Sequence, residues 1–251
     1  MGSFIGPNCV LALPMQEGAG DIIRDISENH NDGTRDSPTW TRLPSGLWVL
    51  SFNGDLINCG SHSSLASIFD GGGALEGWIY VASDGGLNFG RIFWKISGSA
   101  GWHLSTTGEA AGKVKLSFAI YFSTTFGTWG TTATEVTINT WTHILLNYNA
   151  DNVANDPTLE VNGVSVALTE SSTPVGTRVD DSAVTLYLGG QSNKTYSYDG
   201  RQALPRLYLA TQSTNRHDQE KYLFEDAEYQ DTVPALLGGR FARMRELAPT
   251  R

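Results

Sequence analysis

The stretch KVKLSFAIYFS, residues 113–123, decides the fold class. Its apolar residues recur at every second position: Val114, Leu116, Phe118, Ile120 and Phe122. Successive side chains of a β-strand point to opposite faces of the sheet, whereas a helix would spread these residues around its axis. The segment therefore predicts a strand with one buried face.

Composition supports an all-β protein. The chain has 251 residues, of which 28 are Gly, and only 17% of the residues are charged. This mix is typical of many short strands joined by tight turns, and such sandwiches often run to about 200–250 residues as one unit. We therefore expect one large all-β domain with an extension.

Charge and hydropathy narrow the range of partners. The formal net charge of -9 at pH 7 opposes binding to nucleic acid, which requires a cationic face. No apolar run approaches the roughly 18 residues of a membrane span. Gly6-Pro7-Asn8 interrupts an N-terminus that has no basic segment, so no secretory signal peptide is expected. These patterns predict no nucleic acid, no membrane, synthesis in the cytoplasm, and either retention there or export without such a signal.

Several ordered motifs resemble one family. Residues 25–34 read DISENHNDGT, and residues 50–54 read LSFNG. This order resembles the opening of LamG-like (concanavalin A-like) jelly-roll domains. Four later segments are also similar to that family, and the likeness covers residues 9–212: EGWIYVA at 76–82, WTHILLNY at 141–148, LEVNG at 159–163 and LYLGG at 186–190.

The resemblance implies a two-sheet antiparallel jelly-roll β-sandwich over residues 1–212. The family usually continues into an I-D-E-V-x-I-Y strand, but residues 201–209 lack the acidic pair, which weakens any transfer of carboxylate chemistry. We expect a short helical segment at 213–231 and a basic C-terminal arm at 232–251. The arginines of the arm are the expected partner-binding residues: Arg240, Arg243, Arg245 and Arg251.

Two cysteines are too few for a disulfide framework. Cys9 and Cys59 lie in apolar, strand-like segments without the Cys-x-x-Cys spacing of metal sites. They are predicted to be buried free thiols, and a single bridge between the first strands is the alternative.

No catalytic constellation is visible. A glycosidase on this fold needs paired carboxylates on one strand, and the spacing is absent from the sandwich region; Glu225-Asp226-Ala227-Glu228 is wrongly spaced and lies in the predicted helix. No G-x-S-x-G nucleophile elbow is present. The resemblance implies a structural role for His143, and His30 lies in a polar loop where we expect it to be solvated. The chain is predicted not to be an enzyme.

Two kinds of binding site remain open. Calcium prefers several oxygen ligands, and one candidate set is Asp25, Asn29, Asn31, Asp32 and Asp199. The alternative is that these side chains form turns by bonding their own backbone, and no cofactor is required. Glycans stack on aromatic rings, and the candidates in loop-like segments rich in Gly, Ser and Thr are Trp102, Trp129 and Tyr196. The alternative for each ring is a loop clamp.

These observations leave two functional hypotheses. The first is a structural or adhesive component of a virion, such as a phage capsid decoration, fibre or tail protein, acting as a homo-oligomer with protein partners in a larger assembly. The second is a lectin-like module that binds a cell-surface glycan, with or without calcium. In both, the sandwich is the scaffold and loops or the arm carry recognition.

Overall fold

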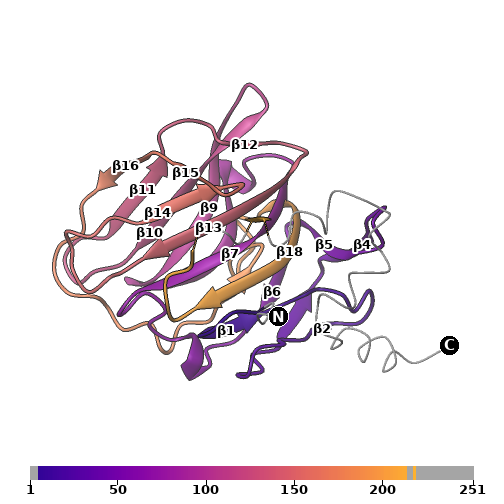
Figure 1. Cartoon of the computed structure of the whole chain (residues 1–251), viewed down its shortest axis with the longest axis horizontal. Coiled ribbons are helices and arrows are strands. Elements are labelled where there is room, and N and C mark those ends of the chain that lie inside the picture. The colour runs from indigo at the N-terminus through magenta and orange to yellow at the C-terminus, as the bar shows by residue number, and fades with distance from the viewer. Residues whose placement is uncertain (1–4, 214–216, 219–251) are drawn as a thin grey trace.

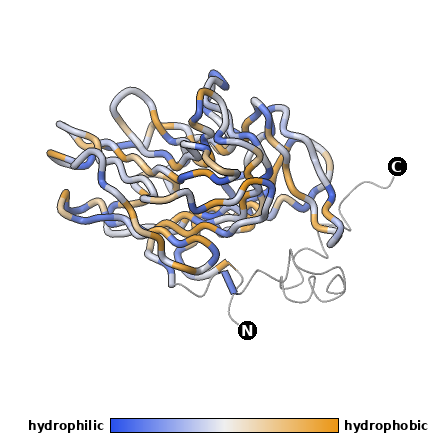
Figure 2. The backbone as a smooth tube through the Cα atoms, turned by 90° about the horizontal axis from the view of Figure 1, so that it is seen from above, coloured by the Kyte–Doolittle hydropathy of each residue, from blue (hydrophilic) through white to orange (hydrophobic). Residues whose placement is uncertain are grey.

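The computed structural model describes residues 5–213 and 217–218. Two antiparallel sheets pack face to face, which confirms the predicted β-sandwich (Figure 1). Seen from above, apolar and polar residues alternate along the strands of both layers (Figure 2). No helix of the described residues is long and apolar enough to cross a bilayer.

The first sheet has eight strands in the order β15-β14-β13-β7-β18-β5-β4, with β1 also paired to β18. Its strands are β1 (Cys9–Ala12), β4 (Thr39–Arg42), β5 (Trp48–Asn53), β7 (Gly73–Val81), β13 (Trp141–Tyr148), β14 (Thr158–Val161), β15 (Val164–Val166) and β18 (Asp199–Tyr208).

The second sheet has ten strands in the order β16-β11-β10-β9-β8-β17-β6-β3-β2, with β12 paired to β10. Its strands are β2 (Ile22–Ile23), β3 (Gly33–Asp36), β6 (Leu56–Asn58), β8 (Phe89–Ser97), β9 (Ala100–Ala110), β10 (Lys113–Ile120), β11 (Gly127–Thr131), β12 (Val136–Thr137), β16 (Leu168–Ser172) and β17 (Tyr187–Leu188). Two short 3-10 helices, η1 (Ser63–Leu65) and η2 (Gly86–Asn88), lie in connections.

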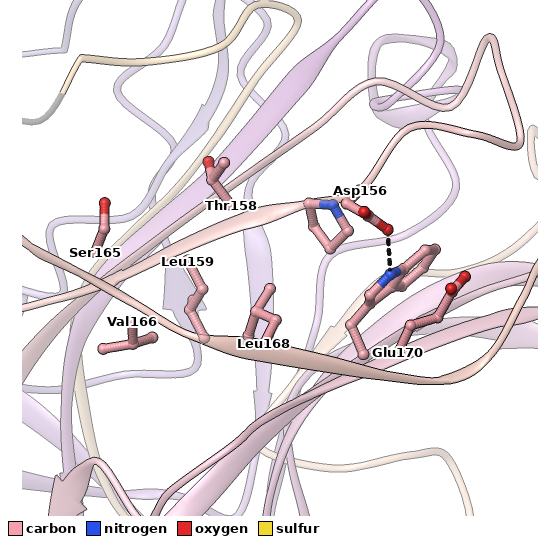
Figure 3. A pocket seen from close by; sticks show the side chains of 9 residues that line it. Asp156, Thr158, Leu159, Ser165, Val166, Leu168 and Glu170 are labelled. Carbon is pink, nitrogen blue, oxygen red and sulfur yellow. Dashed lines mark hydrogen bonds between the residues drawn. The ribbon is translucent and has the colours of Figure 1, made fainter.

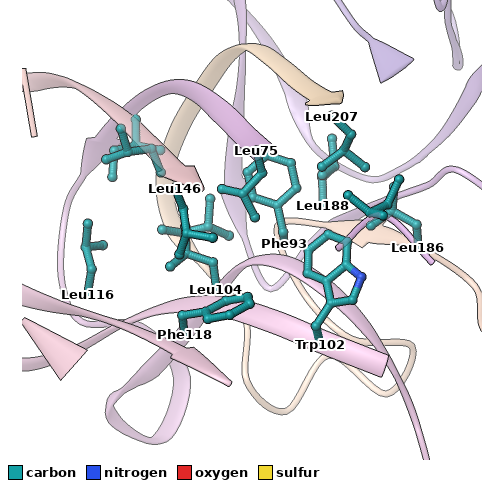
Figure 4. Close-up of a cluster of buried hydrophobic side chains, with 14 of the residues drawn as sticks. Leu75, Phe93, Trp102, Leu104, Leu116, Phe118, Leu146, Leu186, Leu188 and Leu207 are labelled. Carbon is teal, nitrogen blue, oxygen red and sulfur yellow. The ribbon is translucent and has the colours of Figure 1, made fainter. Parts of the chain in front are cut away.

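The core lies between the sheets and confirms the alternation in β10. Its predicted inward residues are at most 4% exposed, from Val114 to Phe122. They meet large side chains from both sheets, including Phe93, Leu104 and Leu146 (Figure 4). Burial of this apolar surface is the main force that closes the sandwich.

Two local features set the strand order. Asn162 and Gly163 have φ values of 52° and 75°, the left-handed pair that a two-residue hairpin between β14 and β15 requires. In β18 the register shifts between Ala203 and Arg206, and Leu204 adopts a φ of 53°. On one edge of β18, β5 pairs before this bulge and β1 pairs after it.

The remaining sequence predictions have mixed outcomes. Cys9 and Cys59 are buried free thiols, as expected. His143 is buried, with its Nε2 3.8 Å from Glu76 Oε2, and His30 is exposed. Most of the predicted 213–231 helix and the whole 232–251 arm, with Arg240, Arg243, Arg245 and Arg251, lie outside the described residues.

Candidate functional site

A pocket opens where both sheets end. β15 is the edge strand of the first sheet and β16 is the edge strand of the second, and both lie at the same end of the molecule (Figure 1). Between them is a cavity of about 320 Å³, which we call the edge pocket. Its lining residues are Trp129, Asp156, Pro157, Thr158, Leu159, Ser165, Val166, Leu168 and Glu170.

Trp129 holds one wall of the edge pocket in place. Its indole N–H donates a 2.8 Å hydrogen bond to Asp156 Oδ1 (Figure 3). The ring is only 2% exposed and packs on Phe118 and Tyr148. A Cβ at Gly127 would lie 2.3 Å from the indole, so a glycine is required there. Trp129 is therefore a positioning residue for Asp156 and not an open stacking platform.

Carboxylates set the chemistry of the edge pocket. Asp156 and Glu170 are exposed and lie at the same end of it (Figure 3), and among the residues that the structure describes no Lys, Arg or His side chain lines it. The pKa of Tyr148 is raised to about 12, first by burial and then by the charge of Asp156. The pocket therefore offers hydrogen-bond acceptors to hydroxyl or ammonium groups and repels anions.

Trp102 is not a loop residue, and the prediction of a loop is wrong. It lies in β9 and points into the core (Figure 4). It is fully buried, and its ring centroid is 5.2 Å from that of Phe69. The adjacent Gly101 has a φ of 102°, and a Cβ there would collide with the carbonyl oxygen of Lys95. The glycine permits close approach of two strands, and Trp102 has no ring face available for a sugar.

The Gly- and Thr-rich neighbours of Trp129 also predict a loop, and this prediction is wrong too, because Trp129 lies in strand β11. Tyr196 does lie in a connection, between β17 and β18, and is half-buried. Its ring is 5.0 Å from the guanidinium carbon of Arg91 and 6.4 Å from the ring of Phe89. The structure therefore places the three aromatic candidates in three separate environments.

The Asp25 loop is a hydrogen-bonded turn. Asp25 Oδ1 accepts from the backbone N–H groups of Ala12 and Ser27, and Oδ2 accepts from Ser27 Oγ and the Asn31 N–H. Asp32 Oδ1 accepts from the Asp25 N–H. The side chains expected to ligate calcium therefore bond the chain itself, which is the alternative interpretation of this motif.

The other members of the expected calcium set do not complete a site. Asn29 is exposed, and Asp199 starts β18 and accepts a 2.8 Å hydrogen bond from Ser83 Oγ. The Asp25 loop bonds β1 beside the far end of β18, about 20 Å away at the usual rise per residue. Within the described residues, no group of three or more His, Cys, Asp or Glu side chains could hold a metal.

Sequence reasoning missed Asp156, Glu170 and Arg91. Asp156-Pro157 has the local pattern of a turn, Glu170 is an isolated charge, and Arg91 is a basic residue within a strand. Their surroundings depend on tertiary neighbours that leave no trace in local sequence.

The comparisons with solved structures concern the fold. The binding domain of Paraclostridial Mosquitocidal Protein 1 has a TM-score of 0.61 and 18% identity, with 86% of this chain and 52% of that chain covered. The botulinum neurotoxin serotype G binding domain has a TM-score of 0.62 and 11% identity, with 86% of this chain and 51% of that chain covered. Botulinum neurotoxin type C has a TM-score of 0.62 and 9% identity, with 87% of this chain and 52% of that chain covered. Cell entry of that toxin depends on interaction with two ganglioside molecules.

At these identities the likeness shows the fold alone, a jelly-roll sandwich. The chain spans about half the length of these neighbours. No family model matches the sequence, and no curated protein does.

Proposed function

We propose that this chain is a non-catalytic carbohydrate-binding module and that the edge pocket holds the sugar. The observation that carries the proposal is the Asp156 carboxylate, fixed by a buried indole N–H beside a second carboxylate, Glu170. Fixed acceptors next to apolar side chains are what a polyhydroxylated ring requires, because its hydroxyls donate hydrogen bonds while its C–H face packs on apolar surface.

The pocket's size and lining define the ligand class. Its 320 Å³ lies at the lower end of the roughly 300–1,000 Å³ typical of ligand sites, which suits one or two sugar rings. Leu159, Val166 and Leu168 supply the apolar contact. With two carboxylates and no cation among its described lining residues, the pocket favours neutral or amino sugars over acidic ones.

The structural neighbours support a binding role. Two of them are binding domains, and a third is a toxin whose cell entry depends on interaction with two ganglioside molecules. The affinity of one small pocket for a sugar is modest, so tight binding requires several copies of the module to bind together.

A glycan array followed by calorimetry tests the proposal. The chain should retain neutral or amino sugars, and Asp156→Asn and Glu170→Gln should each weaken the Kd by about tenfold, the value of a hydrogen bond to a charged group. Glu28→Gln is the matched control, because Glu28 is an exposed carboxylate in the loop that follows Asp25, outside the pocket. Absence of glycan binding, or equal binding by all variants, would overturn the proposal.

A role in a particle is the second candidate, and the two edge strands favour it. Within residues 5–213 and 217–218, β15 and β16 each pair on one side only, so their outer edges offer backbone groups to another chain. Incorporation into a virion stays a prediction. Removing residues 232–251 should lower the mass of the particle in solution, and an unchanged mass with unchanged assembly would count against this role.

A further inference from the structure

Arg91 has an unusual environment on the second sheet. Its pairing partner is Ser105, and Trp94 pairs with His103, so a bulge between Arg91 and Phe93 places Arg91 and Trp94 on one face of the sheet. That face is opposite to the one on which Trp102 and Leu104 enter the core. The bulge therefore aims a cation and an indole outward together.

Aromatic rings surround the guanidinium. Its carbon is 4.9 Å from the ring centroid of Trp94, 5.0 Å from that of Tyr196 and 5.7 Å from that of Phe89. Arg91 is 9% exposed, whereas Phe89 is 42% exposed. We name Phe89, Arg91, Trp94, His103 and Tyr196 the arginine cluster.

Arg91 has no anionic partner among the described residues. No hydrogen bond or ion pair joins its side chain to residues 5–213 or 217–218, and its Nε is fully enclosed. Burial lowers its pKa to about 10, and the phenols of Tyr196 and Tyr121 offset only part of that effect. Cation–π contacts leave the N–H donors without acceptors.

The other buried cations in the described part of the chain are paired. Lys95 lies 3.1 Å from Asp181, and Arg206 lies 2.8 Å from Glu76. Arg178, 10% exposed, lies 2.8 Å from Asp181 as well. Because a buried charge without a counterion is costly, the missing anion at Arg91 indicates that a ligand supplies it.

His103 adds a second polar atom without a hydrogen-bond partner in the described part of the chain, its enclosed Nδ1. The His103 ring lies 5.3 Å from that of Trp94. Burial and the nearby Arg91 charge keep its pKa well below the usual value, so the ring is neutral at pH 7. The Nδ1 of a neutral imidazole accepts one hydrogen bond in one tautomer and donates one in the other, which suits a hydroxyl beside an anionic group.

We propose that the arginine cluster is a second binding site, which takes the carboxylate of an acidic saccharide, a uronate or a sialate, on the Arg91 guanidinium. The exposed ring of Phe89 and the half-buried ring of Tyr196 pack against the sugar. The choice of a saccharide rests on the proposed function, whereas the anion preference rests on Arg91 itself. A guanidinium suits a carboxylate because its planar fork donates two parallel hydrogen bonds.

An NMR titration of the whole chain tests the site directly. The Arg91 Nε–Hε signal is followed during addition of a glucuronate oligosaccharide, sialyllactose, lactose or inorganic sulfate. At least one acidic saccharide should shift this signal, and lactose should not. The acidic saccharide that binds more tightly shows whether the site takes a uronate or a sialate. No shift with either acidic saccharide would overturn the proposal, and so would sulfate binding as tightly, which would mean an adventitious ion only.

Substitutions separate recognition from folding. Arg91→Gln should weaken acidic-saccharide binding by about tenfold or more. Arg201→Gln is the matched control, because the Arg201 guanidinium also lies over a ring, 4.7 Å from that of Tyr80, on the other sheet. If Arg91→Gln fails to fold, Tyr196→Ala should weaken the same binding while the chain stays folded. Unchanged affinity in the folded variants would overturn the proposal.

The two sites fail separately. If acidic saccharides shift the Arg91 signal while Asp156→Asn has no effect on neutral sugars, the edge pocket is wrong and the arginine cluster stands. If neutral-sugar binding requires Asp156 and acidic saccharides do not shift the Arg91 signal, the arginine cluster is wrong and the edge pocket stands.

Discussion

The edge pocket and the arginine cluster offer opposite chemistry from one sandwich. The pocket lies between the edges of the two sheets and presents the carboxylates of Asp156 and Glu170. The cluster lies on the outward face of the second sheet and presents the donors of Arg91 and His103. A jelly roll can therefore place acceptors at its edge and donors on its face, because each site draws on different strands and loops.

The two regions also differ in how they are held. The pocket depends on Trp129, a core side chain that contacts Phe118 and Tyr148. The cluster lies outside the core, and its rings are partly exposed. Mutation should therefore affect stability at the pocket and recognition at the cluster.

Removing the indole gives the largest expected effect. Trp129→Ala should lower the free energy of unfolding by about 3–5 kcal/mol, because it opens a cavity in the core. Urea denaturation measures the change. Trp129→Phe retains most of the ring but not the N–H donor, so it should cost less stability and still weaken neutral-sugar binding. A Trp129→Ala protein as stable as the original would contradict the assignment of this side chain to the core.

Removing a counterion compares the two kinds of buried cation. Asp181 accepts from the Ser67 N–H and pairs with both Lys95 and Arg178. Asp181→Asn leaves Lys95 without its anion, whereas Arg178 keeps Asp70 at 3.4 Å, and the substitution should cost about 3 kcal/mol.

Arg91→Gln removes a cation that has no anion in the described part of the chain, so its cost should be under about 1 kcal/mol. Urea denaturation of both variants gives the comparison. Equal costs would mean that Arg91 is as well compensated as Lys95, which would weaken the case for a ligand there.

The local sequence pattern predicts the strands and turns of the sandwich better than it predicts the edge pocket and the arginine cluster. The alternation in β10 and the Asn162-Gly163 turn are encoded within a few residues, and the structure has both. Asp156 and Trp129 are 27 positions apart and meet only through the fold. The cluster needs the register of β8 on β9 together with the connection that carries Tyr196, so no local signal could identify it.

Glycine misled the placement of the tryptophans. Gly101, Gly127 and Gly130 beside Trp102 and Trp129 are typical of loops, yet all three lie in strands. Gly101 and Gly127 have no room for a Cβ because a neighbouring backbone or ring fills the space. Composition alone does not distinguish a glycine that makes a turn from one that permits close packing.

Acid pH should lower the stability of the protein because His103 stays neutral in the folded chain, and this effect is smaller than those of Trp129→Ala and Asp181→Asn. Its pKa in the folded chain lies well below 6.5, so as pH falls through 6.5 the unfolded chain takes up a proton that the folded chain does not. The free energy of unfolding should therefore fall by up to about 1.4 kcal/mol per pH unit below that point. Urea denaturation at pH 7.5 and 5.5 measures the loss, which His103→Asn should reduce and His62→Asn, at an exposed position, should not. The same slope in both variants would place the acid sensitivity elsewhere and would mean that His103 is not held neutral beside Arg91.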